Sequence, residues 1–386
     1  MKNIIAHRYV RTLLSGLFIG FASAVLAVGD TPDSWHGRVD ELAAPLIEKE
    51  KVVGTVIGLL TRDGKREFYS YGTTKADGPQ PTPETLFEIG SVSKTFTTLL
   101  LALMVERGEV KLDDPVRLLL PKEWVLPRRG EREVTLLDLA THSSGLPENP
   151  PNLIRAIIKD PSVQLDPFAH FDHKQLSESL NELKLKDVDK PPVAYSNLGM
   201  GLLGEALVIK TGKSYDELIR TQIAEPLQMK DTVVIPSDAQ DKRTATGHGK
   251  KAKELPCWTF ASMAGAGAIR STATDLLTYL EAESGRTQTP LAAAMAATQE
   301  RRQTAFVIMS VGLGWFMRDY DGRRVWWHNG GTGGFTTFVA FCREPAVGVV
   351  VLCNTGPEGL DDGQIIDKVG EKLIRQLAGT GDPAKK

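Results

Sequence analysis

Cysteine is scarce in this chain of 386 residues, which contains only Cys257, Cys342 and Cys353. Three cysteines are too few for a disulfide scaffold, and an odd number leaves at least one thiol unpaired. Cys342 and Cys353 flank an expected hairpin that turns near residues 343–345. Such a turn would pair Cys342 with a residue near Gly348 rather than with Cys353. We therefore expect free, buried thiols.

An excess of charge of either sign is also lacking, because 46 Lys and Arg residues nearly balance 48 Asp and Glu residues and leave a net charge of -2. This balance gives no reason to expect a nucleic acid or an anionic membrane as a partner. Among the seven histidines, only His170 and His173 have a spacing that resembles metal ligands. No Cys or Glu cluster accompanies them, so we interpret this segment as a loop and expect neither a metal nor another cofactor.

Long apolar runs are lacking after the first 27 residues, so we expect no stable membrane span in the mature protein. The one run that is present, residues 13–26, is uncharged and follows the basic side chains of Lys2, His7, Arg8 and Arg11. It is shorter than the ~20 residues that a bilayer requires. Small or modest residues end it at Ala27, which predicts a signal peptide over residues 1–27. No cysteine that could carry a lipid anchor lies near Ala27. We therefore expect a soluble monomer that is periplasmic or secreted.

The order of the predicted elements indicates a mixed α+β or α/β fold with two regions. Strand patterns occur near both ends of the chain, and helical patterns dominate from Ser91 to about Ala264. This order predicts an antiparallel sheet flanked by helices, with an inserted, mainly helical region and the active site between the two. We assign residues 28–88 and 265–386 to the sheet region and residues 89–264 to the helical region. The individual elements expected are helices at 34–51, 91–107, 136–140, 198–210, 215–223, 275–283 and 365–377, and strands at 52–60, 67–72, 312–319, 324–328, 332–342 and 347–353.

Ser91 and Lys94 form the only Ser-x-x-Lys motif of the chain, at the start of an apolar helical pattern. Three residues apart on a helix, the two side chains share one face, so the amine can reach the hydroxyl. The start of a helix also favours a developing negative charge at Ser91. A serine hydroxyl needs such help to act as a nucleophile. The motif alone is weak, since this spacing is common on solvated helices.

Tyr195 and Asn197 form a second motif between a Pro-rich loop and a predicted helix. If Tyr195 lies beside Lys94, we expect the pKa of its phenol to fall, which would make it a general base. Asn197 could donate to a substrate carbonyl, or it could simply cap the following helix.

A third motif, His328-Asn329-Gly330, ends a predicted strand and leads into Gly331. Glycines allow a substrate backbone to approach a strand closely. The N–H groups of Gly331 and Ser91 would together form an oxyanion hole. His328 alone could equally be a buried histidine at a strand end. A literal Lys-Thr-Gly at residues 210–212 follows a helical run, where Gly212 suits a helix terminus, so we reject it as a site.

Taken together, the three motifs resemble those of the penicillin-recognising serine hydrolases, in particular the class C β-lactamase group, which carries Ser-x-x-Lys, Tyr-x-Asn and Lys-Thr-Gly in this order. The resemblance spans roughly residues 52–354 and includes the segments 136–147 and 225–232. It implies a β-lactamase-like fold, catalysis by Ser91, Lys94 and Tyr195, and substrate binding by Asn197, His328, Asn329 and Gly330.

The resemblance also limits the choice of substrates. It places hydrolysis of a β-lactam amide first, before a D-alanyl-D-alanine carboxypeptidase or endopeptidase and a short-chain carboxylesterase. A sensor that is acylated by penicillin without turnover is the non-enzymatic alternative. The chain departs from the family pattern where His328 replaces lysine. The charge of a histidine near neutral pH depends on its surroundings. This replacement puts β-lactam turnover in doubt more than it does acylation.

Overall fold

The structure is a computed structural model that describes residues 35–49, 52–188, 190–306 and 308–380. The signal peptide predicted for residues 1–27 lies outside these ranges. Within them, no helix combines the length and the apolar character needed to cross a membrane.

An eight-stranded antiparallel sheet forms the centre of the fold, with the strand order β2-β1-β12-β11-β10-β9-β8-β7. Strand β1, near the start of the described chain, pairs with β12, near its end, as the register of Thr55 opposite Cys353 shows. This pairing confirms the expected sheet, whose strands come from both ends of the chain. The strands are β1 (Gly54–Leu60), β2 (Arg66–Gly72), β7 (Gln303–Phe306), β8 (Met309–Val311), β9 (Phe316–Tyr320), β10 (Arg323–Gly331), β11 (Thr336–Arg343) and β12 (Ala346–Cys353).

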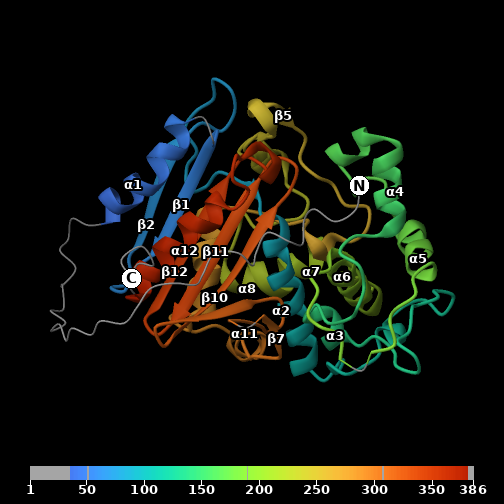
Figure 1. The fold of residues 1–386 in the computed structure, drawn as a ribbon. Helices are drawn as coiled ribbons and strands as arrows, with labels where there is room; N and C mark the ends of the chain where they lie inside the picture. Colours follow the sequence, from blue (N-terminus) through green and yellow to red (C-terminus); the bar gives the residue numbers. More distant parts are fainter. Residues whose placement is uncertain (1–34, 50–51, 189, 307, 381–386) are drawn as a thin grey trace, which may run out of the picture.

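Helices cover both faces of this sheet (Figure 1). Alternate residues of a strand point to opposite faces. Accordingly, Val349 and Val351 of β12 join one apolar cluster with α1 (Trp35–Glu48) and α12 (Ile365–Ala378). Val350 and Leu352 join the other cluster, with α2 (Ser93–Glu106) and α10 (Ala273–Glu283). The apolar strands near both ends of the chain are therefore buried on both sides.

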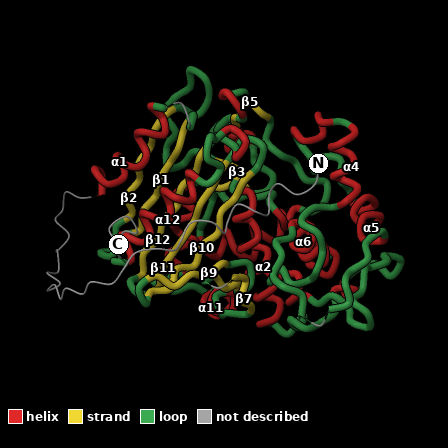
Figure 2. The backbone as a smooth tube through the Cα atoms, viewed as in Figure 1, coloured by secondary structure: helices red, strands yellow, loops and turns green. Residues whose placement is uncertain are grey.

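Helix α2 lies between the sheet and the helices of the inserted region, among them α4 (Pro151–Lys159), α5 (His173–Asn181) and α6 (Asn197–Thr211), which Figure 2 shows gathered on one side of the strands. It contacts α6 on that side and α11 (Ala292–Thr298). Gly212 ends α6 in the left-handed conformation, with φ at 67°, which confirms that the literal Lys-Thr-Gly is a helix terminus. The other helices are α3 (Leu136–Ala140), α7 (Tyr215–Ile219), α8 (Glu225–Leu227) and α9 (Asp238–Asp241).

Several local predictions require correction. Helix α4 is not among the predicted helices; it begins at Pro151, because proline fits the first turn of a helix, where its missing N–H costs nothing. The loop interpretation of His173 is wrong, since this residue starts α5 and bonds Glu205 at 2.7 Å. Strands β7 and β8 and helix α11 were not predicted, and all three are short. All three cysteines are free, as expected, but only Cys342 and Cys353 are buried, whereas Cys257 is partly exposed. Cys342 pairs with Val347 across the β11–β12 hairpin.

The packing of α12 on the sheet gives a first testable prediction. A Cβ atom added at Gly370 would lie 2.1 Å from the Phe338 ring on β11. We expect Gly370→Ala to lower the free energy of unfolding by about 1–3 kcal/mol, as overpacked cores do. The matched control is Gly37→Ala on α1, where no atom lies within 4 Å of the new methyl group. This control should raise the free energy of unfolding by about 0.5–1 kcal/mol. Urea denaturation measures both, and equal effects would contradict the packing described here.

Candidate active site

Ser91 lies in a single helical turn, residues 90–92, that leads directly into α2. Gly90 before it is left-handed, with φ at 48°, a conformation that favours glycine. A Cβ atom on Gly90 would lie 2.7 Å from the Gly331 nitrogen, and one on Gly330 would lie 2.0 Å from the Ile89 carbonyl oxygen. The turn and the end of β10 can therefore approach each other only through glycines, and this approach brings the amides of Ser91 and Gly331 close together.

Lys94 is fully buried directly behind Ser91. Its Nζ atom lies 2.8 Å from the Ser91 Oγ atom and 2.6 Å from the Ala266 carbonyl oxygen. No ion pair of Lys94 is found within the described residues, and burial lowers the pKa of its ammonium to about 7, although the charge of Glu148 acts in the opposite direction. At neutral pH a large share of Lys94 is therefore an uncharged amine, which is able to accept a proton.

Tyr195 completes this group, with its ring face 5.0 Å from the Lys94 Nζ atom. Its side chain also hydrogen-bonds Ser91. The expected fall of its pKa is wrong: burial raises the pKa of the phenol, and the bond to Ser91 offsets this only in part. The residue is partly exposed as a whole, but the surroundings of its hydroxyl are enclosed. Tyr195 is therefore a phenol at neutral pH, and Lys94 is the better proton acceptor.

The sequence analysis missed the role of His142, although it quoted the segment that contains this residue. Its ring packs against that of Tyr195, with centroids 4.6 Å apart. Its Nδ1 atom accepts the backbone N–H of Ser196 at 3.2 Å, so the proton of the neutral ring is on Nε2. His142 has a left-handed backbone, with φ at 56°. The loop after α3 thus holds the Tyr195 motif in place through one buried imidazole.

The third motif is divided between the two faces of β10. His328 is fully buried, and its ring lies on the side of Tyr195, with centroids 6.3 Å apart. Burial lowers its pKa to about 3, so the ring is neutral. Asn329 points to the opposite face, where its amide donates to Asp367 of α12 at 2.8 Å. The prediction that Asn329 binds substrate is therefore not supported, because neighbouring residues of a strand face opposite ways.

A cleft of ≈ 380 Å³ opens in front of Ser91. Asn197 lies on its wall and donates its side-chain amide to Asn149 at 3.0 Å, while Ser196 rather than Asn197 caps α6. Thr332 lies on the wall beyond Gly331, and its hydroxyl donates to the buried Glu88 at 2.6 Å. The lining residues are Gly90, Ser91, Asn149, Leu153, Ile154, Ile157, Gln164, Pro167, Phe168, Asn197, Trp258, Phe260, Ala266, Gly267, Gly331 and Thr332.

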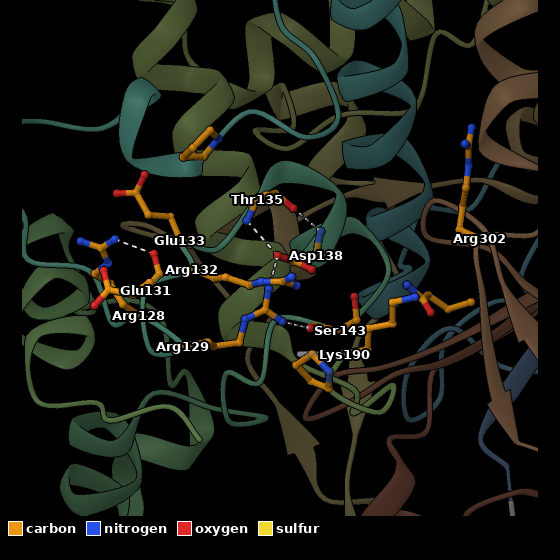
Figure 3. A pocket seen from close by; sticks show the side chains of 13 residues that line it. Arg128, Arg129, Glu131, Arg132, Glu133, Thr135, Asp138, Ser143, Lys190 and Arg302 are labelled. Atoms are coloured by element: carbon orange, nitrogen blue, oxygen red, sulfur yellow. Dashed lines mark hydrogen bonds and ion pairs between the residues drawn. The ribbon is translucent and has the colours of Figure 1, made fainter. Parts of the chain in front are cut away.

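A larger cavity of ≈ 590 Å³ lies elsewhere and contains none of the three motifs. Figure 3 shows Arg129 between Asp138 and Ser143 in this cavity. The Arg129 guanidinium donates to the Asp138 carboxylate at 2.7 Å and to the Ser143 carbonyl at 3.1 Å. These contacts hold the chain next to His142, so we interpret the cavity as the outer side of the loop that supports Tyr195. Within the described ranges, no group of three or more His, Cys, Asp and Glu residues is arranged to hold a metal ion.

Known proteins share both the sequence pattern and the fold. Residues 39–371 match the family model described as Beta-lactamase. The chain is 30% identical over 319 residues to the D-alanyl-D-alanine-carboxypeptidase/endopeptidase AmpH of Escherichia coli (strain K12), which covers 78% of this chain and 80% of that protein. It is 28% identical over 357 residues to a beta-lactamase of Pseudomonas fluorescens, with 82% and 92% covered.

Two solved structures have the same fold over most of their length. A beta-lactamase/D-alanine carboxypeptidase from Yersinia pestis, complexed with citrate, superposes with a TM-score of 0.74 at 27% identity and covers 88% of this chain and 97% of its own. A class C beta lactamase from Rhodobacter sphaeroides gives a TM-score of 0.72 at 28% identity, with 88% and 98% covered. The predicted β-lactamase-like fold, an antiparallel sheet flanked by helices, is thereby confirmed, while the domain boundaries remain a prediction.

The support that His142 gives to Tyr195 can be tested by two substitutions. His142→Leu fills the volume but leaves the Ser196 N–H unpaired and strains the backbone, so we expect kcat to fall roughly ten- to a hundredfold through misplacement of Tyr195. His142→Asn keeps a hydrogen-bond acceptor and tolerates the left-handed conformation, so it should lower kcat by a smaller factor. Steady-state kinetics should show the loss mainly in kcat, with KM changed little. Equal activity of the two variants would contradict a positioning role for His142.

Proposed function

The chain belongs to the Beta-lactamase family and is a serine hydrolase, and from this premise we propose that it forms an acyl-enzyme at Ser91. The observation that supports this proposal most strongly is the 2.8 Å contact between the Ser91 hydroxyl and an amine without an ion-pair partner in the described part of the chain. An uncharged Lys94 makes the adjacent hydroxyl a nucleophile without any further group.

In the acylation step, Ser91 attacks an amide or ester carbonyl and its proton passes to Lys94. The oxyanion that forms is held by the N–H groups of Ser91 and Gly331. A single donor of this kind is typically worth about 3–4 kcal/mol of transition-state stabilisation. Asn197, which lines the cleft, orients the acyl part of the substrate through its amide.

The departing nitrogen or oxygen needs a proton, and Tyr195 is the group that supplies it. Its raised pKa keeps it protonated, and its hydrogen bond to Ser91 places it beside the reacting atoms. The Lys94 ammonium then restores the proton of Tyr195 and becomes neutral again. Water attacks the acyl-enzyme in the second half of the cycle, gives its proton to Lys94, and Ser91 regains its hydroxyl as the acid leaves.

The β-lactam amide, the amide of a D-alanyl-D-alanine peptide and a short-chain ester are all substrates within this chemistry. The activities named for the relatives support the first two. Export with cleavage near Ala27 belongs to the same proposal and is supported by the sequence pattern of residues 1–27. A monomer is sufficient for the proposed mechanism, because every group in it comes from one chain.

Covalent labelling tests the nucleophile directly. Brief exposure to a penicillin or to a fluorophosphonate should add the mass of one acyl or phosphonyl group to Ser91, as intact-protein and peptide mass spectrometry measure it. Ser91→Ala should lose the adduct and all turnover while its circular dichroism is unchanged. Lys210→Ala, in the literal Lys-Thr-Gly at the end of α6, is the matched control and should retain full activity. Turnover by the Ser91→Ala variant would disprove the proposal, and a penicilloyl adduct that never decays, together with no turnover of a peptide or an ester, would indicate a sensor instead of an enzyme.

The pH profile tests the proton acceptor. Lys94 accepts a proton only as the free amine, so kcat/KM should rise with pH and reach half of its maximum near the pKa of about 7. Below that pH the amine fraction, and with it kcat/KM, should fall about tenfold per pH unit. Lys94→Met should abolish acylation at every pH. A flat profile between about pH 5 and pH 9 would show that the protonation of Lys94 does not limit the reaction.

A further inference from the structure

The cleft in front of Ser91 offers no cation to a substrate. Among the described residues that line it, none is lysine or arginine. Lys94 is buried behind Ser91 and engaged by the Ala266 carbonyl. His328 stands where the family has lysine, but it is fully buried, neutral and absent from the lining. A carboxylate that entered this cleft would therefore lose water without gaining an ion pair.

Two carboxylates contact residues of the cleft wall. Glu88 lies behind Thr332 and also accepts the backbone N–H of Trp258 at 2.6 Å. The wall residue Gln164 donates its side-chain amide to Glu358 at 3.0 Å. Burial raises the pKa of Glu88 to about 7, so its charge adds to that of Glu358 above neutral pH. Arg270, which opposes Glu88 from behind, is bonded to Asp241 rather than directed into the cleft.

Much of the remaining wall is apolar. Helix α4 contributes Leu153, Ile154 and Ile157. Phe168 packs between Trp258 and Phe260, with ring centroids 5.8 and 4.9 Å away. Ile154 is 40% exposed, so this helix presents part of its apolar surface to a ligand in the cleft. A surface of this kind binds an aliphatic or aromatic acyl group through burial of apolar area.

On the basis of the function proposed above, we propose that this cleft selects esters and amides that combine an apolar acyl group with a leaving group that carries no carboxylate. Burying a carboxylate without a partner is costly, and sites discriminate strongly against groups that they leave unpaired. Of the substrates considered above, penicillins and D-alanyl-D-alanine peptides carry such a carboxylate, so they should react more slowly than a neutral ester. Acylation of Ser91 itself remains, because the nucleophile and the oxyanion hole do not depend on a cation in the wall.

A matched pair of aryl esters tests this selectivity. The 3-carbamoylphenyl and 3-carboxyphenyl esters of phenylacetic acid share the acyl group and differ by one charge in the leaving group. We expect kcat/KM for the carbamoyl ester to exceed that for the carboxyl ester by about tenfold or more, after each value is divided by the rate of hydroxide hydrolysis. Equal values, or a preference for the carboxylate, would overturn the inference. The corresponding acetate esters should react more slowly, since they leave the apolar wall empty.

Two cation-bearing variants test the cause of the selectivity. Gln164→Arg and Ile154→Arg each place a cation on the cleft wall without changing the buried group. Each should shift the ratio toward the carboxyl ester by roughly tenfold, whereas the neutral controls Gln164→Leu and Ile154→Leu should leave the ratio unchanged. Ratios that do not move in either cationic variant would contradict the role assigned to the missing cation.

The two proposals fail in different ways. Labelling of Ser91 by a fluorophosphonate reports the nucleophile regardless of the leaving group. If Ser91 is labelled and the carboxyl ester is hydrolysed as fast as the carbamoyl ester, the proposed selectivity is wrong and the acyl-enzyme mechanism stands. If Ser91 is not labelled and the Ser91→Ala variant hydrolyses both esters, the mechanism itself is wrong.

Discussion

The burial of one amine beside one hydroxyl is the constraint on which the rest of the site depends. Lys94 is enclosed without an ion pair in the described part of the chain, so its charged form is disfavoured and its free amine is populated near neutral pH. Hydrogen bonds to Ser91 and to the Ala266 carbonyl offset part of the cost of burying this amine. Burial of the apolar side chains of α2, the helix that carries Lys94, stabilises the same region. A lysine at the same position on an exposed helix would be a permanent cation and could not accept the proton of a serine.

The fold satisfies this constraint by joining three distant segments around α2. The glycine-mediated contact between the turn of Ser91 and the end of β10 closes one side of Lys94. The Tyr195 ring covers the other side of Lys94, and the loop that contains His142 packs against this ring. Tyr195 and His328 are both uncharged near neutral pH, because the enclosure of the Tyr195 hydroxyl raises its pKa and burial lowers the pKa of His328. Neither therefore competes with Lys94 as the proton acceptor. The absence of a cation on the described cleft wall follows from the same enclosure, since His328 belongs to this buried group and not to the surface of the cleft.

Much of this arrangement could be predicted from the sequence, because its strongest signals are local. Alternating and apolar runs predicted the sheet strands β1, β2, β10, β11 and β12, and the spacing of Ser91 and Lys94 predicted their shared face. The pKa values could not be predicted, since they depend on how completely the folded chain excludes water from each group. The expected phenolate of Tyr195 was wrong for this reason. The short strands β7 and β8 are stabilised by their neighbours in the sheet and not by a pattern of their own. The orientation of Asn329 could be predicted only from the exact register of β10, because a shift of one residue moves each side chain to the other face of the sheet.

The central claim, that Lys94 is a neutral base, can be measured without any substrate. Nitrogen-15 labelling of lysine side chains and an NMR titration of the Nζ resonance, assigned with the Lys94→Met variant, give its pKa directly. The structure predicts a transition near pH 7, far below that of the exposed lysines of the same chain. A Lys94 resonance that titrates together with the exposed lysines, near their usual pKa of about 10.4, would contradict the account.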